Sequence, residues 1–226
     1  MIHEDAPEGY YDEPRPEVIG CVPQDALDII DVGCASGALG RALKMARPGA
    51  HVRGVELVPA QAERARKVLD DVMQGSADDP LPAHWPAPDC VIFADVLEHL
   101  VDPWETLKRY RKVLKPGGTI VASIPNVANR VVLKDLFRMR WDYQEFGILD
   151  RTHLRFFTRD TALEMFESCD FKIRHVGRTM EKLGRKPLGN FIRGTIAKEN
   201  GRKRVFPRPL AWLIDAYTLQ FLIVAE

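Results

Sequence analysis

A glycine-rich segment, DVGCASGALG at residues 31–40, joins a short apolar run to a segment of helical periodicity. Gly33 and Gly37 permit a tight turn and let the backbone approach a ligand closely, and the following helix N-terminus offers free N–H groups to polar ligand atoms. Glu56 stands 23 residues beyond Gly33, at the end of the next apolar run, where a carboxylate can accept hydrogen bonds from ribose hydroxyls. This order of strand, turn, helix, strand and acid predicts a site for a cofactor that contains a nucleoside.

His153 is the candidate for a catalytic base. It follows the predicted strand 119–124, on the side where open α/β sheets bind ligands, and a neutral imidazole there can take a proton from an attacking hydroxyl. The alternative is a structural histidine that anchors its own loop. Arg151 and Arg155 flank His153 and could bind a phosphate or carboxylate of a substrate through paired hydrogen bonds, or pair with the acidic N-terminal stretch.

The elements that must position these residues alternate between strand and helix, which predicts a parallel sheet covered by helices on both faces. The expected strands are 27–32, 51–57, 90–94, 119–124, 171–176 and 219–225. The expected helices pass through 39–45, cover 59–69, begin at 103, and cover 130–140 and 158–168. The helix at 103 is the best marked, with Asp102 as N-cap, Pro103 at the first helical position and Glu105 three residues past the cap.

The composition is that of a globular protein. The chain has 226 residues, of which 46% are hydrophobic and 28% charged, and its 32 basic residues balance its 32 acidic ones. A zero net charge excludes a bulk polyanion binder and makes nucleic acid an unlikely partner. No signal peptide and no membrane span is predicted, and the four scattered cysteines form no zinc or disulfide pattern, so we expect a cytoplasmic protein with reduced thiols.

Charge is nevertheless distributed unevenly along the chain. Residues 1–30 carry eight acids and one base, whereas residues 178–208 carry ten bases and two acids. We expect a single domain, 1–226, with an N-terminal cap segment (1–26), a cofactor-binding core (27–126), an acceptor-side insertion (127–157) and a basic excursion between the last two strands (179–216). That excursion would face an acidic acceptor or the acidic N-terminus.

The glycines at 33, 37 and 40 do not match the dinucleotide template G-x-G-x-x-G. The segment instead resembles motif I of the class I S-adenosylmethionine-dependent methyltransferases, although Ala35 replaces the usual middle glycine. The resemblance continues through FADVLEHL (93–100), LKPGGTIV (114–121) and SIPN (123–126). The segment GILDRTHLRFFT (147–158) resembles a block shared by ubiquinone-type O-methyltransferases and bacterial methyltransferases of surface-glycan and natural-product pathways.

This resemblance implies an α/β fold: a three-layer Rossmann-like sandwich whose mostly parallel seven-stranded sheet has an antiparallel last strand. It implies S-adenosyl-L-methionine as cofactor, and no metal is required by the sequence. The implied cofactor contacts are Asp31, Gly33, Cys34, Ala35, Gly37, Glu56, Leu57, Ser76, Ala77, Asp95 and Leu97. The implied acceptor-side residues are Tyr11, His99, Asn126, Arg151 and Arg155, where Tyr11 is either a lid or packing and His99 is either a substrate contact or structural.

The resulting hypothesis is in-line methyl transfer, in which the protein chiefly aligns acceptor and methyl group. ADVL at 94–97 stands where base-methylating enzymes of this fold carry an Asn/Asp-Pro-Pro-aromatic motif. This difference favours oxygen methylation of a small molecule or saccharide, including an anionic or sugar-linked one. The alternatives are an RNA or protein methyltransferase that uses the basic segment 178–208, and a catalytically silent module that binds the cofactor as a partner subunit. The sequence does not indicate the oligomeric state.

Overall fold

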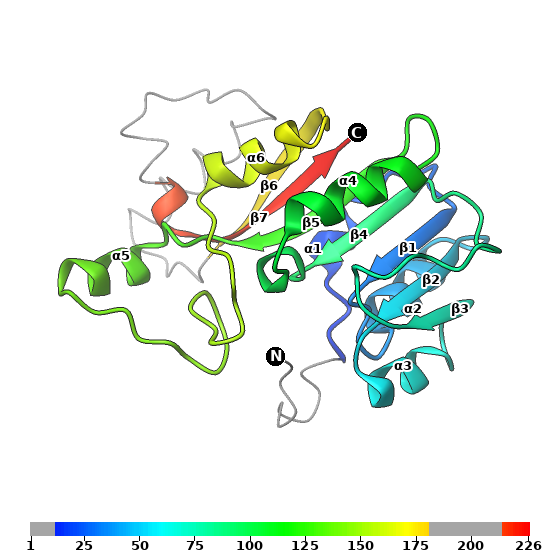
Figure 1. The fold of residues 1–226 in the computed structure, drawn as a ribbon, viewed down its shortest axis with the longest axis horizontal. Helices are drawn as coiled ribbons and strands as arrows, with labels where there is room; N and C mark the ends of the chain where they lie inside the picture. The colour runs from blue at the N-terminus through cyan, green and yellow to red at the C-terminus, as the bar shows by residue number, and fades with distance from the viewer. Residues whose placement is uncertain (1–11, 181–213) are drawn as a thin grey trace.

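The computed structural model describes residues 12–180 and 214–226, which build one seven-stranded sheet covered by helices on both faces (Figure 1). The strands are β1 Asp28–Val32, β2 His51–Glu56, β3 Asp71–Gln74, β4 Cys90–Ala94, β5 Thr119–Pro125, β6 Ile173–Met180 and β7 Thr218–Ala225. The helices are α1 Pro16–Ile19, α2 Ala38–Ala46, α3 Pro59–Ala65, α4 Pro103–Val113, α5 Arg130–Phe137 and α6 Arg159–Ser168, with a 3-10 turn at Leu97–His99.

The strand order is β3-β2-β1-β4-β5-β7-β6. Neighbouring strands from β3 to β5 are parallel, and β7 is antiparallel to both of its neighbours. The predicted three-layer sandwich with a mostly parallel sheet and an antiparallel last strand is therefore confirmed. The order reverses between β1 and β4, and in open α/β sheets a ligand crevice forms at such a reversal, beyond the carboxyl ends of the strands.

Apolar side chains fill both spaces between sheet and helices. On the face of α2 and α3, Leu43 and Val52 are fully buried in one core cluster. On the face of α4 and α6, Tyr110, Phe166 and Phe93 belong to a second cluster, in which the rings of Phe93 and Tyr110 meet edge to face at 5.1 Å. Two buried faces explain why the central strands have continuous apolar sequences rather than alternating ones.

The N-terminal signals of α4 act as expected. The Asp102 side chain accepts a hydrogen bond from the Glu105 backbone N–H at 3.0 Å, and Pro103 occupies the first turn, where its missing N–H has no partner to lose. The helix ends at Val113, before the turn formed by residues 115–118. This capped helix covers β4 and β5, the strands that lead into the predicted site.

Three element boundaries differ by three residues or more from the sequence prediction. Helix α3 ends at Ala65 rather than at 69, because the N–H groups of Lys67 and Val68 bond three residues back and turn the chain toward the glycine-rich segment. Helix α5 ends at Phe137 rather than at 140, and β6 extends to Met180. Strand β3 has only four residues, too few for its alternating burial to stand out in the sequence.

Two predictions fall on residues outside the described ranges. Tyr11 lies just before the described N-terminal segment, and residues 181–213 contain most of the expected basic excursion. Of the described ends of that excursion, Thr179 and Met180 belong to β6, and residues 214–216 form a helical turn that precedes β7. Within the described ranges, no helix combines the length and apolarity needed to cross a membrane.

Candidate active site

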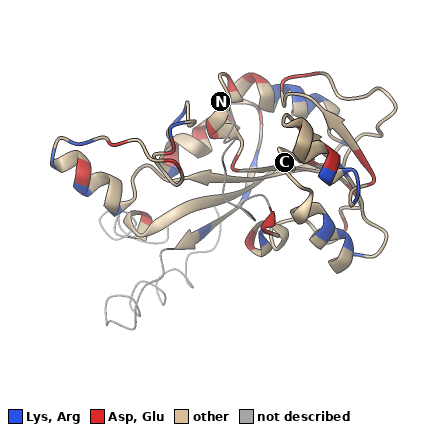
Figure 2. Ribbon diagram, turned by 90° about the horizontal axis from the view of Figure 1, so that it is seen from below, with Lys and Arg blue, Asp and Glu red and all other residues tan. Residues whose placement is uncertain are grey.

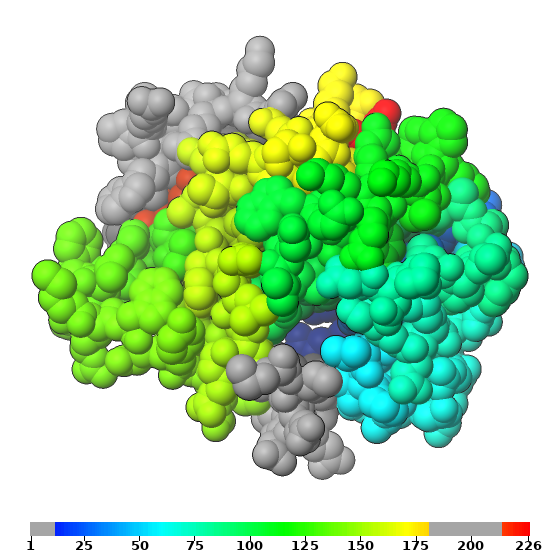
Figure 3. All heavy atoms as spheres, viewed as in Figure 1, coloured from blue at the N-terminus to red at the C-terminus, as the bar shows by residue number. Residues whose placement is uncertain are grey.

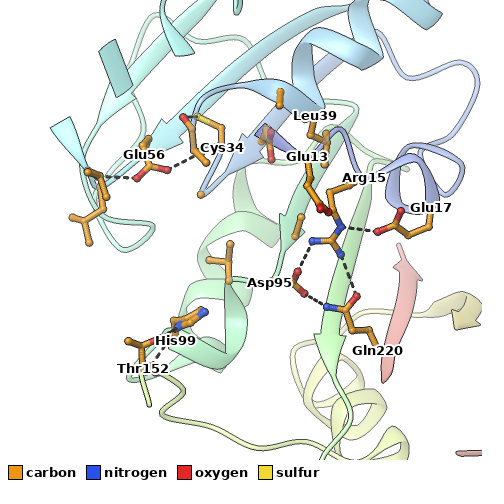
Figure 4. A pocket seen from close by; sticks show the side chains of 18 of the residues that line it. Glu13, Arg15, Glu17, Cys34, Leu39, Glu56, Asp95, His99, Thr152 and Gln220 are labelled. Atoms are coloured by element: carbon orange, nitrogen blue, oxygen red, sulfur yellow. Dashed lines mark hydrogen bonds and ion pairs between the residues drawn. The ribbon is translucent and has the colours of Figure 1, made fainter. Parts of the chain in front are cut away.

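A cavity of about 910 Å³ opens at the carboxyl ends of β1, β2 and β4, where the strand order reverses. Figure 3 shows the surface hollowed between α3 and the segment that precedes α6. This volume lies in the range of ligand-binding clefts. The lining comes from the N-terminal segment, the glycine-rich loop, the ends of β2 and β4, the loop before α6, and β6 and β7 (Figure 4): Glu13, Arg15, Glu17, Asp31, Gly33, Cys34, Ala35, Ala38, Leu39, Glu56, Leu57, Val58, Ala94, Asp95, Val96, His99, Thr152, Thr179, Leu219 and Gln220.

The two glycines of the loop serve different purposes. Gly33 lines the cavity with φ +70°, and a Cβ atom there would lie 2.6 Å from Cγ2 of Val96. Gly37 is the N-cap of α2 with φ +81°, and a Cβ atom would lie 2.8 Å from Cγ2 of Val68. Gly37 does not line the cavity. Glycine is needed at this position because of the left-handed turn and the chain that packs on it after α3, and not because of contact with a ligand.

Ala35 adopts φ +48°, a left-handed conformation that is costly for a residue with a Cβ atom. It lines the cavity, so its methyl group also takes space there. We expect Ala35→Gly to stabilise the fold by roughly 1 kcal/mol, the cost of a left-handed alanine, and to tighten S-adenosylhomocysteine binding by about three- to tenfold because the methyl group no longer takes space in the cavity. Titration calorimetry measures this effect; Ala38→Gly, in the same lining but within α2, is the matched control and should bind no tighter.

Glu56 ties the loop to the end of β2. Its carboxylate accepts hydrogen bonds from the backbone N–H of Ala35 and from that of Val58, both at 2.8 Å (Figure 4). Burial raises the pKa of Glu56, and these backbone hydrogen bonds oppose the shift. The carboxylate is thus fixed at the cavity wall, where it can accept further hydrogen bonds from hydroxyl groups.

Asp31 is 2% exposed at the end of β1, and its Oδ2 atom has no hydrogen-bond partner among the described residues. Burial raises the pKa of Asp31 to about 7; the nearby Glu56 carboxylate adds to the shift, and Arg15 opposes it. An unpartnered buried acceptor is costly. Because Asp31 lines the cavity, a cationic or N–H donor of a ligand can relieve that cost.

Arg15 brings a positive charge into the cavity from the N-terminal segment. Its guanidinium pairs with Asp95 and donates to Ser123 Oγ at 3.0 Å and to Gln220 Oε1 at 3.2 Å. Asp95 also accepts from Ser123 and from Gln220, so one network joins the N-terminal segment to β4, β5 and β7 (Figure 4). Arg15 is the only Arg or Lys among residues 1–30, and this isolation in an acidic stretch is the one sequence signal that marks it.

A second, smaller cavity of about 340 Å³ lies beside the first, and Ala38 lines both. Asp12 enters it among Arg41, Arg64 and Lys67 and pairs with Arg64 at 2.6 Å. A hydrogen bond from Ser36 and another from Arg64 lower the pKa of Asp12. This ion pair holds the described start of the N-terminal segment against the helices beside the cofactor cavity.

We expect Asp12→Asn to weaken S-adenosylhomocysteine binding about two- to fivefold, because the pair is nearly half exposed and such pairs contribute roughly 0.2–1 kcal/mol. The difference from the wild type should shrink in high salt, which screens the pair. Calorimetry at two salt concentrations measures both effects. Glu63→Gln removes the exposed pair of Glu63 with Arg66, outside either cavity, and should leave the affinity unchanged.

His99 lies on the 3-10 turn after β4 and lines the cavity with Thr152. The Thr152 hydroxyl donates to Asp150 Oδ1 at 2.7 Å, so it can only accept from His99 Nδ1, which lies 3.1 Å away. The Thr152 carbonyl, 3.3 Å from Nδ1, is also an acceptor. Nδ1 therefore carries the proton, and Nε2 keeps its lone pair. Burial lowers the pKa of His99, and the neighbouring His153 lowers it further.

His153, the predicted base, lies behind His99 rather than in the cavity lining. It is 8% exposed, its Nδ1 lies 3.0 Å from the Ile148 carbonyl oxygen, and its ring meets that of His99 at 4.7 Å. This matches the alternative interpretation of a histidine that anchors its loop. Glu98, fully buried nearby, has a pKa raised well above its usual value by burial, and neither carboxylate oxygen has a hydrogen-bond partner among the described residues.

Glu98, His99 and His153 each offer one donor atom, and these atoms lie within 4.8 Å of one another. Carboxylate and imidazole groups in such an arrangement are suitable ligands for a divalent cation. The sequence was expected to require no metal, and its local spacing does not bring these three residues together, because His153 lies 54 residues beyond His99. His99 could therefore act as a metal ligand rather than as a base, and chelation experiments distinguish the two roles.

Several predicted contacts lie away from the cavity lining. Leu97 is fully buried in the apolar core, so its side chain cannot reach a ligand there. Asn126 is also fully buried, and its amide donates to the carbonyls of Asp215 and Thr218, which fixes the β5–β7 edge. Four further predicted contacts are outside the lining: Ser76, Ala77, Arg151 and Arg155. Arg155 is exposed and donates a hydrogen bond to the Val101 carbonyl.

Comparison with known proteins assigns the family. A methyltransferase-domain family model matches residues 10–176. The chain is a class I S-adenosylmethionine-dependent methyltransferase. A ubiquinone biosynthesis O-methyltransferase of Saccharophagus degradans is 31% identical to the methyltransferase over 157 residues, which cover 62% of this chain and 65% of that protein. The counterpart of Xylella fastidiosa strain 9a5c is 36% identical over 113 residues, 46% of this chain and 44% of that protein. The methyltransferase thus spans less than two thirds of these curated relatives.

Solved structures agree on the fold. A Thermotoga maritima S-adenosylmethionine-dependent methyltransferase, described as a possible histamine N-methyltransferase, superimposes with a TM-score of 0.62 at 17% identity and covers 93% of this chain and 86% of that one. A magnesium protoporphyrin IX methyltransferase of Synechocystis with bound S-adenosylhomocysteine gives 0.59 at 15% identity, over 96% and 83% of the two chains. The cavity of the methyltransferase suits this cofactor, since Gly33 leaves room for it and Asp31 offers an unpartnered acceptor.

Proposed function

We propose that the methyltransferase transfers the methyl group of S-adenosylmethionine to a hydroxyl oxygen of a small-molecule or saccharide acceptor. The observation that carries the proposal is His99, which lines the cofactor cavity and whose Nδ1 is held by Thr152, so that Nε2 of the neutral imidazole is unprotonated. A hydroxyl must lose its proton as it attacks, and a neutral imidazole is suited to accept that proton. The ubiquinone O-methyltransferase relatives support oxygen as the acceptor atom.

The lining supports an orientation for the cofactor. Asp31 would accept from the ammonium group of its amino-acid end, and Arg15, the only Arg or Lys in the described lining, would pair with its carboxylate. Glu56 would accept from the ribose hydroxyls, with Leu57 and Val58 beyond it. When bound, the sulfonium of the cofactor supplies an electrophilic methyl group. The protein would align the acceptor oxygen with it and receive the acceptor's proton on His99 Nε2.

The described lining offers few positive charges to an acceptor. Arg151 and Arg155, expected to bind an anionic acceptor, lie outside the described lining, whereas Glu13, Glu17 and Asp95 lie within it. This favours a neutral hydroxyl compound over a phosphorylated one, because an added anion would meet carboxylates. Residues 1–11 and 181–213 lie outside the described ranges, so this inference concerns the described lining alone.

The test is methyl transfer with an isotopically labelled S-adenosylmethionine and a panel of phenols, saccharides, amines, RNA and protein. Label on oxygen of a phenol or saccharide is the expected result, and label on an amine nitrogen contradicts it. Label in RNA or protein favours the macromolecular alternative. If S-adenosylhomocysteine binds but nothing in the panel is labelled, the module is catalytically silent toward these acceptors.

A further inference from the structure

The strongest unassigned feature lies on the insertion that carries α5, which projects from the sheet in two perpendicular views (Figures 1 and 2). The described residues have twelve exposed large hydrophobic side chains, and six of them lie within residues 131–143. Soluble surfaces scatter such side chains, so their concentration on one projecting element indicates an interaction surface. The most exposed are Phe137 at 86% and Met139 at 93%.

The end of α5 is built to present these side chains outward. The Met139 N–H donates to the Leu136 carbonyl and the Arg140 N–H to the Asp135 carbonyl, the hydrogen-bond pattern of a Schellman C-cap. The cap places Met139 at φ +59°, a position usually taken by glycine and costly for a residue with a side chain. A strained, almost fully exposed methionine gains nothing from the packing of the described structure, so its apolar side chain has no role there.

Basic side chains surround the same apolar group. Residues 130–143 carry four bases and two acids in a chain whose net charge is zero; Arg138 lies 3.9 Å from Asp135, and Arg140 pairs with Asp142. Lys134, Arg138 and Arg140 are exposed at or beyond the end of α5. We use "arm tip" for the apolar Leu136, Phe137 and Met139 together with these three bases.

We propose that the arm tip docks the methyltransferase onto the surface of an anionic lipid bilayer. A short amphipathic helix with large apolar side chains beside Lys and Arg is the combination that inserts at the headgroup boundary, where the bases meet lipid phosphates. Trp141 and Tyr143, exposed just after the tip, are the residue types that prefer this interface.

A second copy of the chain fits the arm tip less well. A two-fold dimer would bring the same patch of both subunits together and set Lys134, Arg138 and Arg140 against their own copies. A bilayer that contains anionic lipid instead supplies opposite charge to the bases and apolar depth to Phe137 and Met139.

The arm tip also has a physical connection to the cavity. The Trp141 ring meets the Phe156 ring at 5.2 Å, Phe156 meets His153 at 6.2 Å, and His153 meets His99 at 4.7 Å. Helix α5 follows β5, so the arm leaves the sheet at the carboxyl edge where the cavity opens. Docking there would set the cavity near the bilayer, where an acceptor with a lipid portion is concentrated.

The test is sedimentation of the full chain with phosphatidylcholine vesicles that contain or lack phosphatidylglycerol. We expect binding only to the anionic vesicles, release by salt, and at least a tenfold weaker partition for Phe137→Ser with Met139→Ser. Arg138→Gln with Arg140→Gln should weaken binding by about fivefold or more and reduce its salt dependence. Met45→Ser is the matched control, because Met45 is 79% exposed on α2, away from the arm, and its loss should change nothing.

Calorimetry with S-adenosylhomocysteine verifies that each variant is folded, so a loss of vesicle binding reports on the arm tip. The proposal is overturned if the wild-type chain does not sediment with anionic vesicles, or if the Phe137 and Met139 variant binds them equally well. It is also overturned if light scattering shows a dimer that this variant dissociates, since the arm tip would then bind a second copy. None of these results depends on methyl transfer, so the proposed function is tested separately.

Discussion

Replacement of Asp31 by Asn should weaken S-adenosylhomocysteine binding by about 10- to 100-fold, the effect of losing a charge-assisted hydrogen bond at a buried position. The same substitution should stabilise the free protein at neutral pH. Asp31 is buried with one carboxylate oxygen unpartnered among the described residues, and its pKa is raised to about 7. The residue thus lowers the stability of the ligand-free fold and becomes favourable only when a ligand supplies a cation.

The pH dependence follows from the direction of this shift. Below about pH 4 the Asp31 carboxyl is protonated in both the folded and the unfolded chain and contributes no pH-dependent term. As the pH rises from about 4 to about 7, the unfolded chain ionises first, so the fold is progressively destabilised, and above about pH 7 the penalty is constant. The melting temperature of Asp31→Asn should therefore exceed that of the wild type at about pH 8, and the difference should shrink toward about pH 4.

Ligand binding should show the same linkage. If the ammonium group of S-adenosylhomocysteine pairs with Asp31 as proposed, binding below about pH 7 favours the ionised carboxylate and should release a proton. Calorimetry in two buffers with different ionisation enthalpies counts that proton, and Asp31→Asn should release none from this site. Asp28→Asn is the matched control, because Asp28 begins the same strand but pairs with Lys115 and Arg53 outside the cavity. Equal affinities for the wild type and Asp31→Asn would show that Asp31 does not meet the ammonium group.

The parts of the molecule that were predictable are those specified by local residue patterns. The loop at Gly33, the acid Glu56 and the caps of α4 follow from short-range geometry. In the structure, Gly33 and Glu56 both line the cavity. Asp31, Cys34, Ala35, Leu57 and Asp95 also line it. Their positions depend on strand ends, which a parallel sheet brings to one edge whatever the details of packing.

The orientation of the short turn after β4 was not predictable from the sequence. His99 and Leu97, both predicted contacts, are two residues apart on one 3-10 turn, yet only His99 lines the cavity and Leu97 is fully buried. The placement of His153 behind His99 depends on the fold of the loop 147–157, which has little regular structure for a pattern to indicate. Arg15 reaches Asp95 across 80 residues of sequence, a contact that no local spacing encodes.

His99→Ala should reduce the turnover of the hydroxyl acceptor by about 10²- to 10⁴-fold, the usual contribution of a general base, while leaving S-adenosylhomocysteine affinity nearly unchanged. The reason is the proton order along Asp150, Thr152 and His99: the Thr152 hydroxyl donates to Asp150, so His99 Nδ1 donates to Thr152 and Nε2 stays free to accept. Turnover should fall at acidic pH, below the lowered pKa of His99, as the imidazole becomes protonated.

Two further variants separate the base from its surroundings. Thr152→Val removes the hydroxyl but leaves the carbonyl that also accepts from Nδ1, so it should reduce turnover less than His99→Ala and shift the acidic limb of the pH profile. His153→Ala should act through the position of the His99 ring, with a smaller loss. His84→Ala is the control. It should leave turnover unchanged, because His84 is an exposed surface residue that pairs with Asp71 and does not line the cavity.

Chelation decides between the two uses of His99. A base that acts on the acceptor directly needs no ion, so turnover should survive a chelator in the wild type. The other result would be that a chelator abolishes turnover of the wild type, that a divalent cation restores it, and that the cation does not restore turnover in Glu98→Gln. That result would make His99 a metal ligand together with Glu98 and His153, whose donor atoms lie within 4.8 Å of its own. Burial raises the pKa of the Glu98 carboxyl well above its usual value, which favours the first outcome, because protonation of the carboxyl competes with binding of a cation.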